Sequence, residues 1–456
     1  MRTIFQRLLP LVALAVMSSA ALGAQPEPGR TFSLTDAVAY GLSNSNVVRN
    51  ARVDILDAEQ NVKEQFSRGL PQINGSLDFQ HFLKVPQLPL PAAFGMGDPN
   101  APETIAFQLK NNFTAGLSAR GMLFDGSFFV GLRAARASGE YYNLALASTQ
   151  REVRGQVTRA YFPVLLLKTN VAVLNNNISN LEKLKNEVAA QYDAGFVEQL
   201  DVDRLTLSLN NLRSRRDQVM QQAENALRAL KFTINYPVDE PLRVEDDLDK
   251  FQTDIDAAAL TADIPYGERP EIQLLDKTIM LQGLNEELQR AAYLPTVYAS
   301  VAGQYQHQGN RPFSAGDDPN EADFGFWAPT IVLGLTANIP IYDFGGRAAR
   351  VERAKLATQK VVNQRNDARR GIQLEVLNAR ATFTANNDRL SVTRDNLDLA
   401  RRIYDTTQIK YREGVGSSLE IVQAEQALYE SQATFLNALY ETLVAKEDLF
   451  LALGRN

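Results

Sequence analysis

The feature that most constrains this chain is a pair of very long helical segments joined by one tight turn, within residues 125–230. Residues 128–192 contain a single proline, Pro163, and their polar and apolar residues recur at helical spacing. Gly195 follows and can take the positive φ that ends a helix, and Asp201 lies where a carboxylate favours the positive end of the next helix dipole. At 1.5 Å per residue the first helix would reach roughly 100 Å. A helix of that length must span something larger than a compact core.

The second of these helices carries the apolar spacing of a coiled coil. Its apolar positions alternate three and four residues apart, broken by Arg216, and they are Val202, Leu205, Leu209, Leu212, Val219, Ala223 and Leu230. The segment therefore predicts a helical hairpin packed along one seam.

Composition excludes several classes of function. The chain has 456 residues with 47 basic and 53 acidic side chains, a formal charge of −6, so we expect no nucleic-acid partner. It has no cysteine, which excludes disulfides, thiolate metal sites and a cysteine nucleophile. Its two histidines, His81 and His307, form no pair at metal-ligand spacing. A paired pH or metal site at these histidines is conceivable, but two isolated polar residues are the preferred interpretation, and we expect no cofactor and no metal.

Residues 1–24 have the three parts of a secretory signal peptide. Arg2 and Arg7 form the positive head, residues 8–17 the apolar middle, and residues 18–24 the small-residue end. The apolar run is too short to cross a bilayer as a helix, and no later segment is expected to reach that length. The chain is thus predicted to be exported, and to enter a membrane only by strands.

Two stretches change from helical to strand periodicity. After a helix over residues 32–68, Ile73, Leu77 and Phe79 fall on one face of a strand and polar residues fall on the other. Residues 107–118 alternate in the same way, and so do residues 297–305 and 327–339. Each pair predicts a β-hairpin that is apolar on one side only.

The chain is internally duplicated. Pro71 corresponds to Pro295 (295 − 71 = 224), Asp125 to Asp343 (343 − 125 = 218) and Gly195 to Gly414 (414 − 195 = 219). We expect a first repeat at 25–231, with a β-hairpin at 71–124 and a helical hairpin at 127–231. A connector at 232–268 leads to a second repeat at 269–456, with a β-hairpin at 295–343 and a helical hairpin at 345–453.

Four strands cannot close a barrel, and an open sheet edge in lipid leaves backbone groups unpaired at several kcal/mol each. Amphipathic strands of about ten residues in an exported protein fit an outer-membrane barrel, so several copies would have to pool their strands. Phe324, Phe326 and Trp327 lie where an interfacial aromatic girdle would fall. A soluble sandwich is the alternative, but it gives no reason to join each hairpin to such long helices.

The residues resemble the TolC-like outer-membrane efflux proteins over essentially the whole mature chain. The resemblance is carried by Leu34-Thr35-Asp36-Ala37-Val38, by Leu-Pro at 70–71 and 294–295, by residues 339–346 (Ile-Pro-Ile-Tyr-Asp-Phe-Gly-Gly), and by Tyr-x-x-Gly at 192–195 and 411–414. It implies a mostly α fold with β: four transmembrane strands per chain complete a trimeric twelve-stranded barrel. A long periplasmic α-helical barrel with a mixed equatorial region continues it.

The implied function is a passive exit duct of a tripartite efflux or type I secretion system, in the outer membrane of a Gram-negative-type bacterium. Its partners would be two further copies, a periplasmic adaptor, an inner-membrane pump of RND or ABC type, and outer-membrane lipid. No phosphate-binding Gly-Lys motif is present to supply energy, and no catalytic motif predicts an enzyme.

The resemblance also assigns the two helical turns to the periplasmic tip. The predicted adaptor contacts are Gly195, Phe196, Val197, Gly414, Val415 and Gly416. Spacing alone favours a simpler interpretation, in which the glycines only end their helices; the resemblance favours the adaptor.

In the same family, carboxylates in the second tip helix ring the closed aperture. The first of these positions holds Glu420 and the next holds Gln423; a carboxylate ring and an ordinary helix N-terminus explain Glu420 about equally well. Of the family's tyrosine–acid–arginine latch, Tyr411 and Asp201 match, but Gly416 takes the place of the arginine. The latch should be weaker or built differently.

Two other classes remain open. A poreless, periplasm-spanning coiled coil accounts for the helices but not for the amphipathic strands. A cell-envelope hydrolase could use Asp246, Asp247 and Asp249, although a charged connector explains them better because acid–base chemistry needs positioned partners. The sequence does not identify the transported substrate.

Overall fold

A computed structural model describes residues 30–89, 104–106, 108–251, 260–261, 263–319 and 321–454; the expected signal peptide, residues 1–24, lies outside them. The chain divides into two compact units. The helical unit comprises Met1–Asn46, Glu152–Ala262 and Ala379–Leu451, and the sheet unit comprises Val47–Arg151, Asp263–Asn378 and Ala452–Asn456. Each unit therefore draws on both halves of the sequence.

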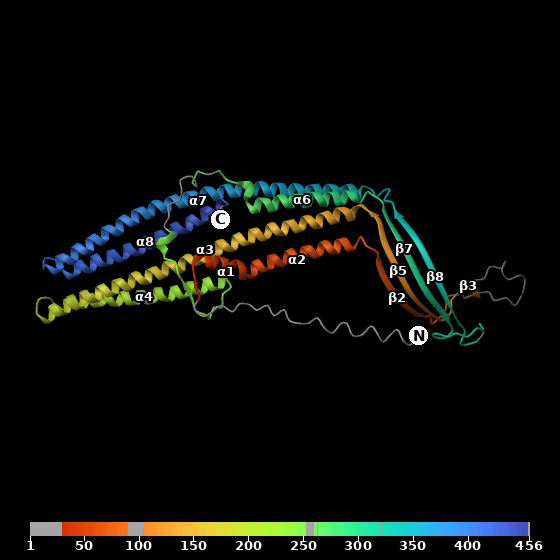
Figure 1. Cartoon of the computed structure of the whole chain (residues 1–456), viewed down its shortest axis with the longest axis horizontal. Helices are drawn as coiled ribbons and strands as arrows, with labels where there is room; N and C mark the ends of the chain where they lie inside the picture. Colours follow the sequence, from red (N-terminus) through yellow and green to blue (C-terminus); the bar gives the residue numbers. More distant parts are fainter. Residues whose placement is uncertain are drawn as a thin grey trace, which may run out of the picture. The chain divides into compact units, whose positions relative to one another are not determined.

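The sheet unit is built on four antiparallel strands that lie side by side in the order β2-β5-β7-β8 (Figure 1). They are β2 (Gln72–His81), β5 (Asn111–Asp125), β7 (Thr296–Gly309) and β8 (Gly325–Asn338). β2 pairs with β5 and β7 pairs with β8, as expected for two β-hairpins, and β5 pairs with β7 to join them. Among the described residues the sheet is open, with β2 and β8 at its edges.

Strand register gives this sheet one apolar and one polar face. Leu77, Ala115, Tyr305 and Pro329 form one row across the four strands, and Ser76, Gly116, Gln304 and Thr330 form the next row. Because neighbouring residues of a strand point to opposite faces, the two rows lie on opposite sides. The period-two alternation in the sequence is therefore realised across all four strands.

A helix precedes and a longer helix follows each β-hairpin. The preceding helices are α2 (Asn46–Ser67) and α6 (Pro270–Ala291), and the following helices are α3 (Gly126–Asp193) and α7 (Gly346–Arg412). Equivalent aspartates begin the long helices: Asp125 accepts a hydrogen bond from the Ser127 backbone N–H at 2.8 Å, and Asp343 accepts one from the Arg347 N–H at 2.7 Å. Each carboxylate satisfies a donor at a helix start.

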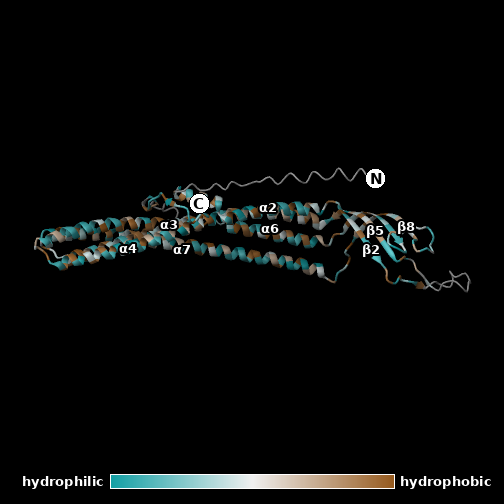
Figure 2. Cartoon of the chain, turned by 90° about the horizontal axis from the view of Figure 1, so that it is seen from below, coloured by the Kyte–Doolittle hydropathy of each residue, from teal (hydrophilic) through white to brown (hydrophobic). Residues whose placement is uncertain are grey.

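In the helical unit, α3 and α7 pair with α4 (Gln199–Thr233) and α8 (Ser418–Ala452). Apolar and polar residues interleave along these helices (Figure 2). The coiled-coil seam predicted for α4 is buried at Leu205, Leu209, Leu212 and Val219, which pack with apolar residues of α3 such as Leu181. That prediction is confirmed.

The predicted single helix over residues 32–68 is wrong, because the chain breaks at Ser45 between α1 (Leu34–Asn44) and α2. Ser45 has extended backbone angles, and the carbonyl of Asn44 accepts a hydrogen bond from the Asn235 side chain at 2.9 Å. Serine and asparagine side chains compete with the helical backbone for hydrogen bonds, so a Ser-Asn-Ser-Asn run is a natural place for the break.

The connector contains a strand that periodicity did not predict. Three-residue β6 (Leu242–Val244) pairs in parallel with β1 (Arg30–Phe32). The buried Asp246 just beyond it accepts hydrogen bonds from the Leu34 N–H at 2.8 Å and the Tyr161 hydroxyl at 3.1 Å. Asp246 thus anchors the connector to α1 and α3. The remaining short elements are the helical turns η2 (Leu248–Phe251) and η3 (Tyr266–Glu268), and the strand pair β3 (Leu88–Pro89) and β4 (Thr104–Ile105).

One stretch within α3 is long and apolar enough to cross a membrane by length and composition, contrary to the prediction that no segment after the signal peptide reaches that length. In that stretch 39% of the residues are buried inside the protein, and one such helix is weak evidence for a membrane span.

Candidate functional site

The turns between α3 and α4 and between α7 and α8 have the same backbone construction. Gly195 has a φ of 80° and Gly414 a φ of 73°, as the sequence predicts for glycines that end helices. The Phe196 N–H then donates to the Gln191 carbonyl at 2.9 Å, and the Val415 N–H donates to the Lys410 carbonyl at 3.0 Å. These bonds satisfy carbonyls that a helix end leaves free.

Both turns present apolar side chains to solvent. Phe196 is 82% exposed and Val415 is 78% exposed. Val197 is half-buried against the α3–α4 seam. Gly416 is packed closely, because a Cβ there would lie 3.1 Å from the Tyr411 backbone nitrogen. Each helical hairpin thus ends in a turn that carries one exposed apolar side chain.

Asp201 joins the first helical hairpin to the second, but not through Tyr411. Its carboxylate accepts a hydrogen bond from the Ser418 hydroxyl at the start of α8, and the Arg204 guanidinium lies 3.9 Å from it. Arg204 also donates to the Ser418 hydroxyl at 3.2 Å. The Tyr411 hydroxyl is buried without a hydrogen-bond partner among the described residues, and this burial raises the pKa of Tyr411.

Deeper in the helical unit, Glu425 is a fully buried carboxyl group at 0% exposure. It accepts hydrogen bonds from the Tyr429 hydroxyl of its own helix and from the Ser208 hydroxyl of α4 at 3.1 Å. Burial raises the pKa of Glu425. Burial and the neighbouring Glu425 charge also raise the pKa of Tyr404 on α7 to about 12. Periodicity did not predict this cluster, although a glutamate between the apolar positions Ala424 and Leu428 was a usable signal.

The predicted aperture residues, Glu420 and Gln423, are both exposed on α8. Two further contacts join the hairpins: Asn177 donates to Gln432 at 2.6 Å, and Arg412 donates to Glu187 at 3.2 Å. The second is an exposed ion pair and contributes little on its own.

The three predicted interfacial aromatics divide between the faces of the sheet. Trp327 lies on the apolar face and stacks on Tyr305, with ring centroids 4.9 Å apart. Phe326 lies on the opposite, polar face, and the centroids of the Phe324 and Phe326 rings are 6.3 Å apart. Periodicity did not predict the row across the sheet that is formed by Phe79, Phe113, His307 and Trp327.

The two histidines have separate partners. His81 Nδ1 lies 2.8 Å from Asn111 Oδ1, and the buried His307 places Nε2 2.6 Å from the Ser314 carbonyl. In the part of the chain that the structure describes, no group of three or more His, Cys, Asp or Glu residues could hold a metal ion.

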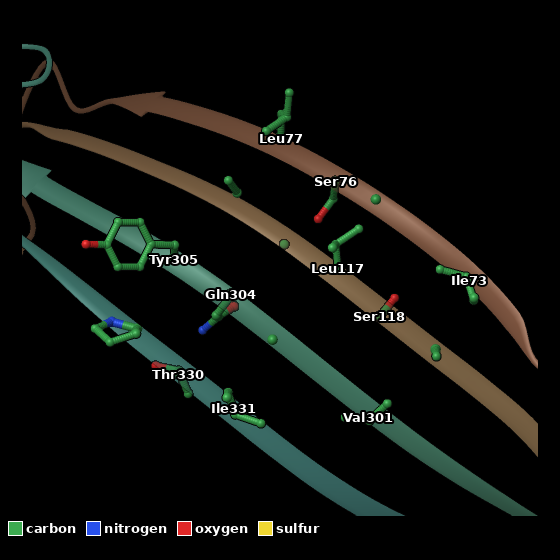
Figure 3. A pocket seen from close by; sticks show the side chains of 16 residues that line it. Ile73, Ser76, Leu77, Leu117, Ser118, Val301, Gln304, Tyr305, Thr330 and Ile331 are labelled. Carbon is green, nitrogen blue, oxygen red and sulfur yellow. The ribbon is translucent and has the colours of Figure 1, made fainter. Parts of the chain in front are cut away.

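The apolar face of the sheet is exposed and hollowed (Figure 3). The hollow has a cavity volume of about 920 Å³ and is lined by residues of all four strands, including Ile73, Leu117, Val301 and Ile331. Gly75 and Gly303 flank Leu117 in one row, which leaves space on either side of its side chain. Leu117 is 68% exposed and Ile331 is 79% exposed. A face of this kind is energetically costly in water and suits lipid.

Comparison with known proteins places this architecture in a class. Residues 268–455 match the family model described as outer membrane efflux protein. The chain is 24% identical over 351 residues to the toluene efflux pump outer membrane protein TtgF of Pseudomonas putida, covering 73% of this chain and 68% of TtgF. It is 25% identical over 355 residues to the cation efflux system protein CusC of Escherichia coli, covering 75% of this chain and 73% of CusC. A crystal structure of CusC superposes with a TM-score of 0.69 at 19% identity, covering 93% of this chain and 92% of CusC.

The curated relatives are outer membrane components of efflux systems, which are transport proteins rather than enzymes. The matched residues 268–455, the curated relatives and the solved structures together support a TolC-like outer membrane factor. Its place is the outer membrane of a Gram-negative bacterium.

Proposed function

We propose that three copies of this chain form the exit duct of a tripartite efflux system, working with a periplasmic adaptor and an inner-membrane pump. The observation that carries this proposal is the open four-stranded sheet, whose apolar face is exposed and whose edge strands are unpaired among the described residues. Pooling strands from three copies gives a twelve-stranded barrel with lipid outside and a polar lumen inside.

In this proposal the long helices continue the duct into the periplasm, and the two turns form its tip. Phe196, Val197 and Val415 supply apolar contact to the adaptor, and Gly195 and Gly414 allow its backbone to approach closely, while Gly416 lets its own turn pack against Tyr411. Glu420 lines the aperture with one carboxylate per copy, next to the uncharged Gln423. Trp327 and Phe324 lie at the membrane interface, and Phe326 faces the lumen.

The contact that restrains the tip is proposed to run through Asp201, Ser418 and Arg204. These residues join the two helical hairpins of one copy, whereas the Tyr411 hydroxyl makes no hydrogen bond among the described residues. Opening of the tip then requires separation of Asp201 from Ser418.

The test is to purify the mature protein in detergent, measure its oligomeric mass and record conductance in planar bilayers. A trimer with stepwise conductance is expected. A monomer that is soluble without detergent contradicts the duct, and a trimer without conductance favours the poreless coiled-coil alternative.

The role of the tip is tested separately in cells. Phe196→Ser combined with Val415→Ser should abolish efflux without loss of the assembled protein. Phe232→Ser is the matched control, because Phe232 is also exposed (80%) but lies at the far end of α4. Equal loss of efflux in both would reject the assignment of the tip.

The relatives named above are a toluene pump component and a cation efflux component, so similarity alone does not choose a substrate. We expect the pump to choose it. Crosslinking and pull-down from the native envelope should recover an adaptor and an RND-type or ABC-type pump, and the identity of that pump separates efflux from protein secretion.

A further inference from the structure

The two β-hairpins of the chain correspond residue by residue. Gln72 pairs with Arg120 in the first hairpin, and Thr296 pairs with Asn338 in the second. The first strands therefore differ by 224 positions (296 − 72 = 224) and the second strands by 218 (338 − 120 = 218). These offsets equal those of Pro71 to Pro295 and Asp125 to Asp343 in the sequence. The pairing within each hairpin is thus the same.

The chain also contains one junction between hairpins, where β5 pairs with β7. There Leu117 lies opposite Gly303, and Ala119 lies opposite Val301. A closed ring of identical copies needs one more junction per copy, between β8 and the β2 strand of a neighbouring copy. Because the hairpins are equivalent, the first junction is a template for the second.

We propose that β8 pairs with β2 of a neighbouring copy in the register that the β5–β7 junction specifies. Adding 218 to a residue number in β5 gives its equivalent in β8, and subtracting 224 from a residue number in β7 gives its equivalent in β2. The β5–β7 pairs therefore place Leu335 opposite Phe79 of the neighbouring copy, and Ala337 opposite Leu77. The same shift places Asn338 opposite Ser76. This register rests on the trimeric barrel proposed above and adds the residues that form its seams.

The polarity of the facing side chains agrees with this register, although the register was obtained from residue-number offsets alone. Leu335 (71% exposed), Phe79 (52%) and Leu77 (76%) all belong to the apolar face, so apolar meets apolar across the seam. Asn338 and Ser76 belong to the polar face. A slip of one residue would turn every apolar side chain of β8 against the polar face of β2, so such a slip is excluded wherever one face meets lipid.

The template also predicts how β8 changes on assembly. β5 continues to Asp125, but its equivalent β8 ends at Asn338, five positions before Asp343. Ile339, Ile341 and Tyr342 in this interval are exposed by 64%, 89% and 74%. We expect residues 339–343 to become strand when the neighbouring β2 pairs with them, with Pro340 contributing no N–H to the ladder.

A bulge should accompany this extension. The β5–β7 register shifts between Met122 and Phe124, which leaves Leu123 as the extra residue. The equivalent of Leu123 is Ile341 (123 + 218 = 341). Ile341 should therefore be unpaired in the seam, with Tyr342 opposite Ile73 of the neighbouring copy.

Cysteine crosslinking tests the register directly, because the natural chain has no cysteine. Two double variants match it: Ala337→Cys with Leu77→Cys, and Asn338→Cys with Ser76→Cys. Consecutive antiparallel pairs alternate between Cα separations of about 4.5 and 5.5 Å, and a disulfide needs less than about 7 Å. Leu335→Cys with Leu77→Cys is the control, shifted by two residues.

Each variant is assembled in detergent, oxidised and run on a denaturing gel without reductant. Both register pairs should give covalent oligomers, at least tenfold more than the control, and these oligomers must join different copies because β5 and β7 separate β2 from β8 within one chain. Trimers that crosslink only in the shifted control, or in neither register pair, overturn the register and leave the duct standing. Failure of every variant and of the natural chain to form a trimer overturns both proposals.

Discussion

The two strand-to-helix junctions of this chain occupy equivalent places but have different surroundings. At the first, Asp125 accepts hydrogen bonds from Ser127 and, at 3.1 Å, from the Tyr298 hydroxyl of the adjacent strand. Gly126 is packed so tightly that a Cβ there would lie 2.6 Å from a methyl carbon of Leu294. Residues of the same chain thus pack against this junction on both sides.

The second junction is closed on one side only. Asp343 begins α7 as Asp125 begins α3, but the position equivalent to Gly126 holds Phe344, which is 92% exposed with a φ of 52°. The equivalent of Leu294 would be Leu70 of a neighbouring copy (294 − 224 = 70). The duplicated sequence therefore retains the helix start at both junctions. The packing around the two junctions differs because the second junction follows β8, which is the edge strand of the sheet.

The largest effect is expected at Arg347, which stabilises the second junction from within. Its buried guanidinium donates to the Pro340 carbonyl at 2.8 Å, lies 3.3 Å from Asp343 and covers the Tyr293 ring at 5.0 Å. Arg347→Ala should lower the free energy of unfolding by about 3 kcal/mol, because it removes the buried guanidinium's hydrogen bond to Pro340, its ion pair with Asp343 and its packing on Tyr293. Thermal unfolding of the assembled protein measures the loss.

The matched control is Phe129→Ala, because Phe129 is the equivalent position in the first junction (347 − 218 = 129) and is 54% exposed. Phe129→Ala should lower the free energy of unfolding much less than Arg347→Ala does. Equal losses would mean that the two junctions do not differ in the way described.

The next effect concerns Asp201 and its equivalent, Glu420 (420 − 201 = 219). Asp201→Ala should raise single-channel conductance, because the charge-assisted bond to Ser418 is worth about 2 kcal/mol. Tyr411→Phe should leave conductance unchanged, and adding it to Asp201→Ala should add nothing. Glu420→Ala should change cation preference rather than conductance. A conductance increase from Tyr411→Phe alone would restore Tyr411 to the latch.

A smaller, pH-dependent effect is expected at Glu425, whose equivalent in the first hairpin is the neutral Thr206 (425 − 219 = 206). Burial raises the pKa of Glu425 above 4.5, so the protonated form is favoured in the folded state. Its contribution to stability is present below pH 4.5 and is lost as pH rises through the raised pKa. Glu425→Gln stays neutral, so it should stabilise the protein at pH 7 and have little effect at pH 4.

Within the described part of the chain, the hydroxyls of Tyr429 and Ser208 bond Glu425, and Tyr404 on α7 lies close enough for the Glu425 charge to raise its pKa. Their protons remain bound across this pH range, so they should not mask the titration. Thermal unfolding at both pH values, with the exposed Glu430→Gln as control, makes the measurement. A stabilisation that is the same at pH 4 and pH 7 would rule out the titration of Glu425 as its cause.

Sequence periodicity predicted the elements that repeat along the chain, and missed contacts that depend on how helices are rotated. The strands, the α4 seam and the turn glycines follow from spacing alone. The pairing of β1 with β6 did not, because three-residue strands have no measurable period and their anchor, Asp246, resembles one member of a charged run. Ser418 was missed because nothing local shows that it faces Asp201.

The smallest effect tests whether the two turns are as alike as their backbones indicate. Gly195→Ala and Gly414→Ala should each cost about 1 kcal/mol locally, because a side chain is strained at positive φ. Nothing lies within 4 Å of a Cβ built at either glycine, so no packing term should separate them. Amide exchange at Phe196 and Val415 should quicken about fivefold, the factor that corresponds to 1 kcal/mol.

Two further variants sharpen this last comparison. Gly195→Asn should lose less protection than Gly195→Ala, because asparagine tolerates the left-handed conformation. Gly416→Ala should destabilise its turn by steric contact and not by backbone strain. The φ of Gly416 is not positive, but a Cβ there would lie 3.1 Å from the Tyr411 backbone nitrogen. The equivalent position in the first turn already holds Val197 (416 − 219 = 197). Gly414→Ala could lower amide protection in its turn far more than Gly195→Ala does in the other. That result would mean that close packing around Gly416 makes the second turn the stiffer of the two. The adaptor would then meet two unlike surfaces.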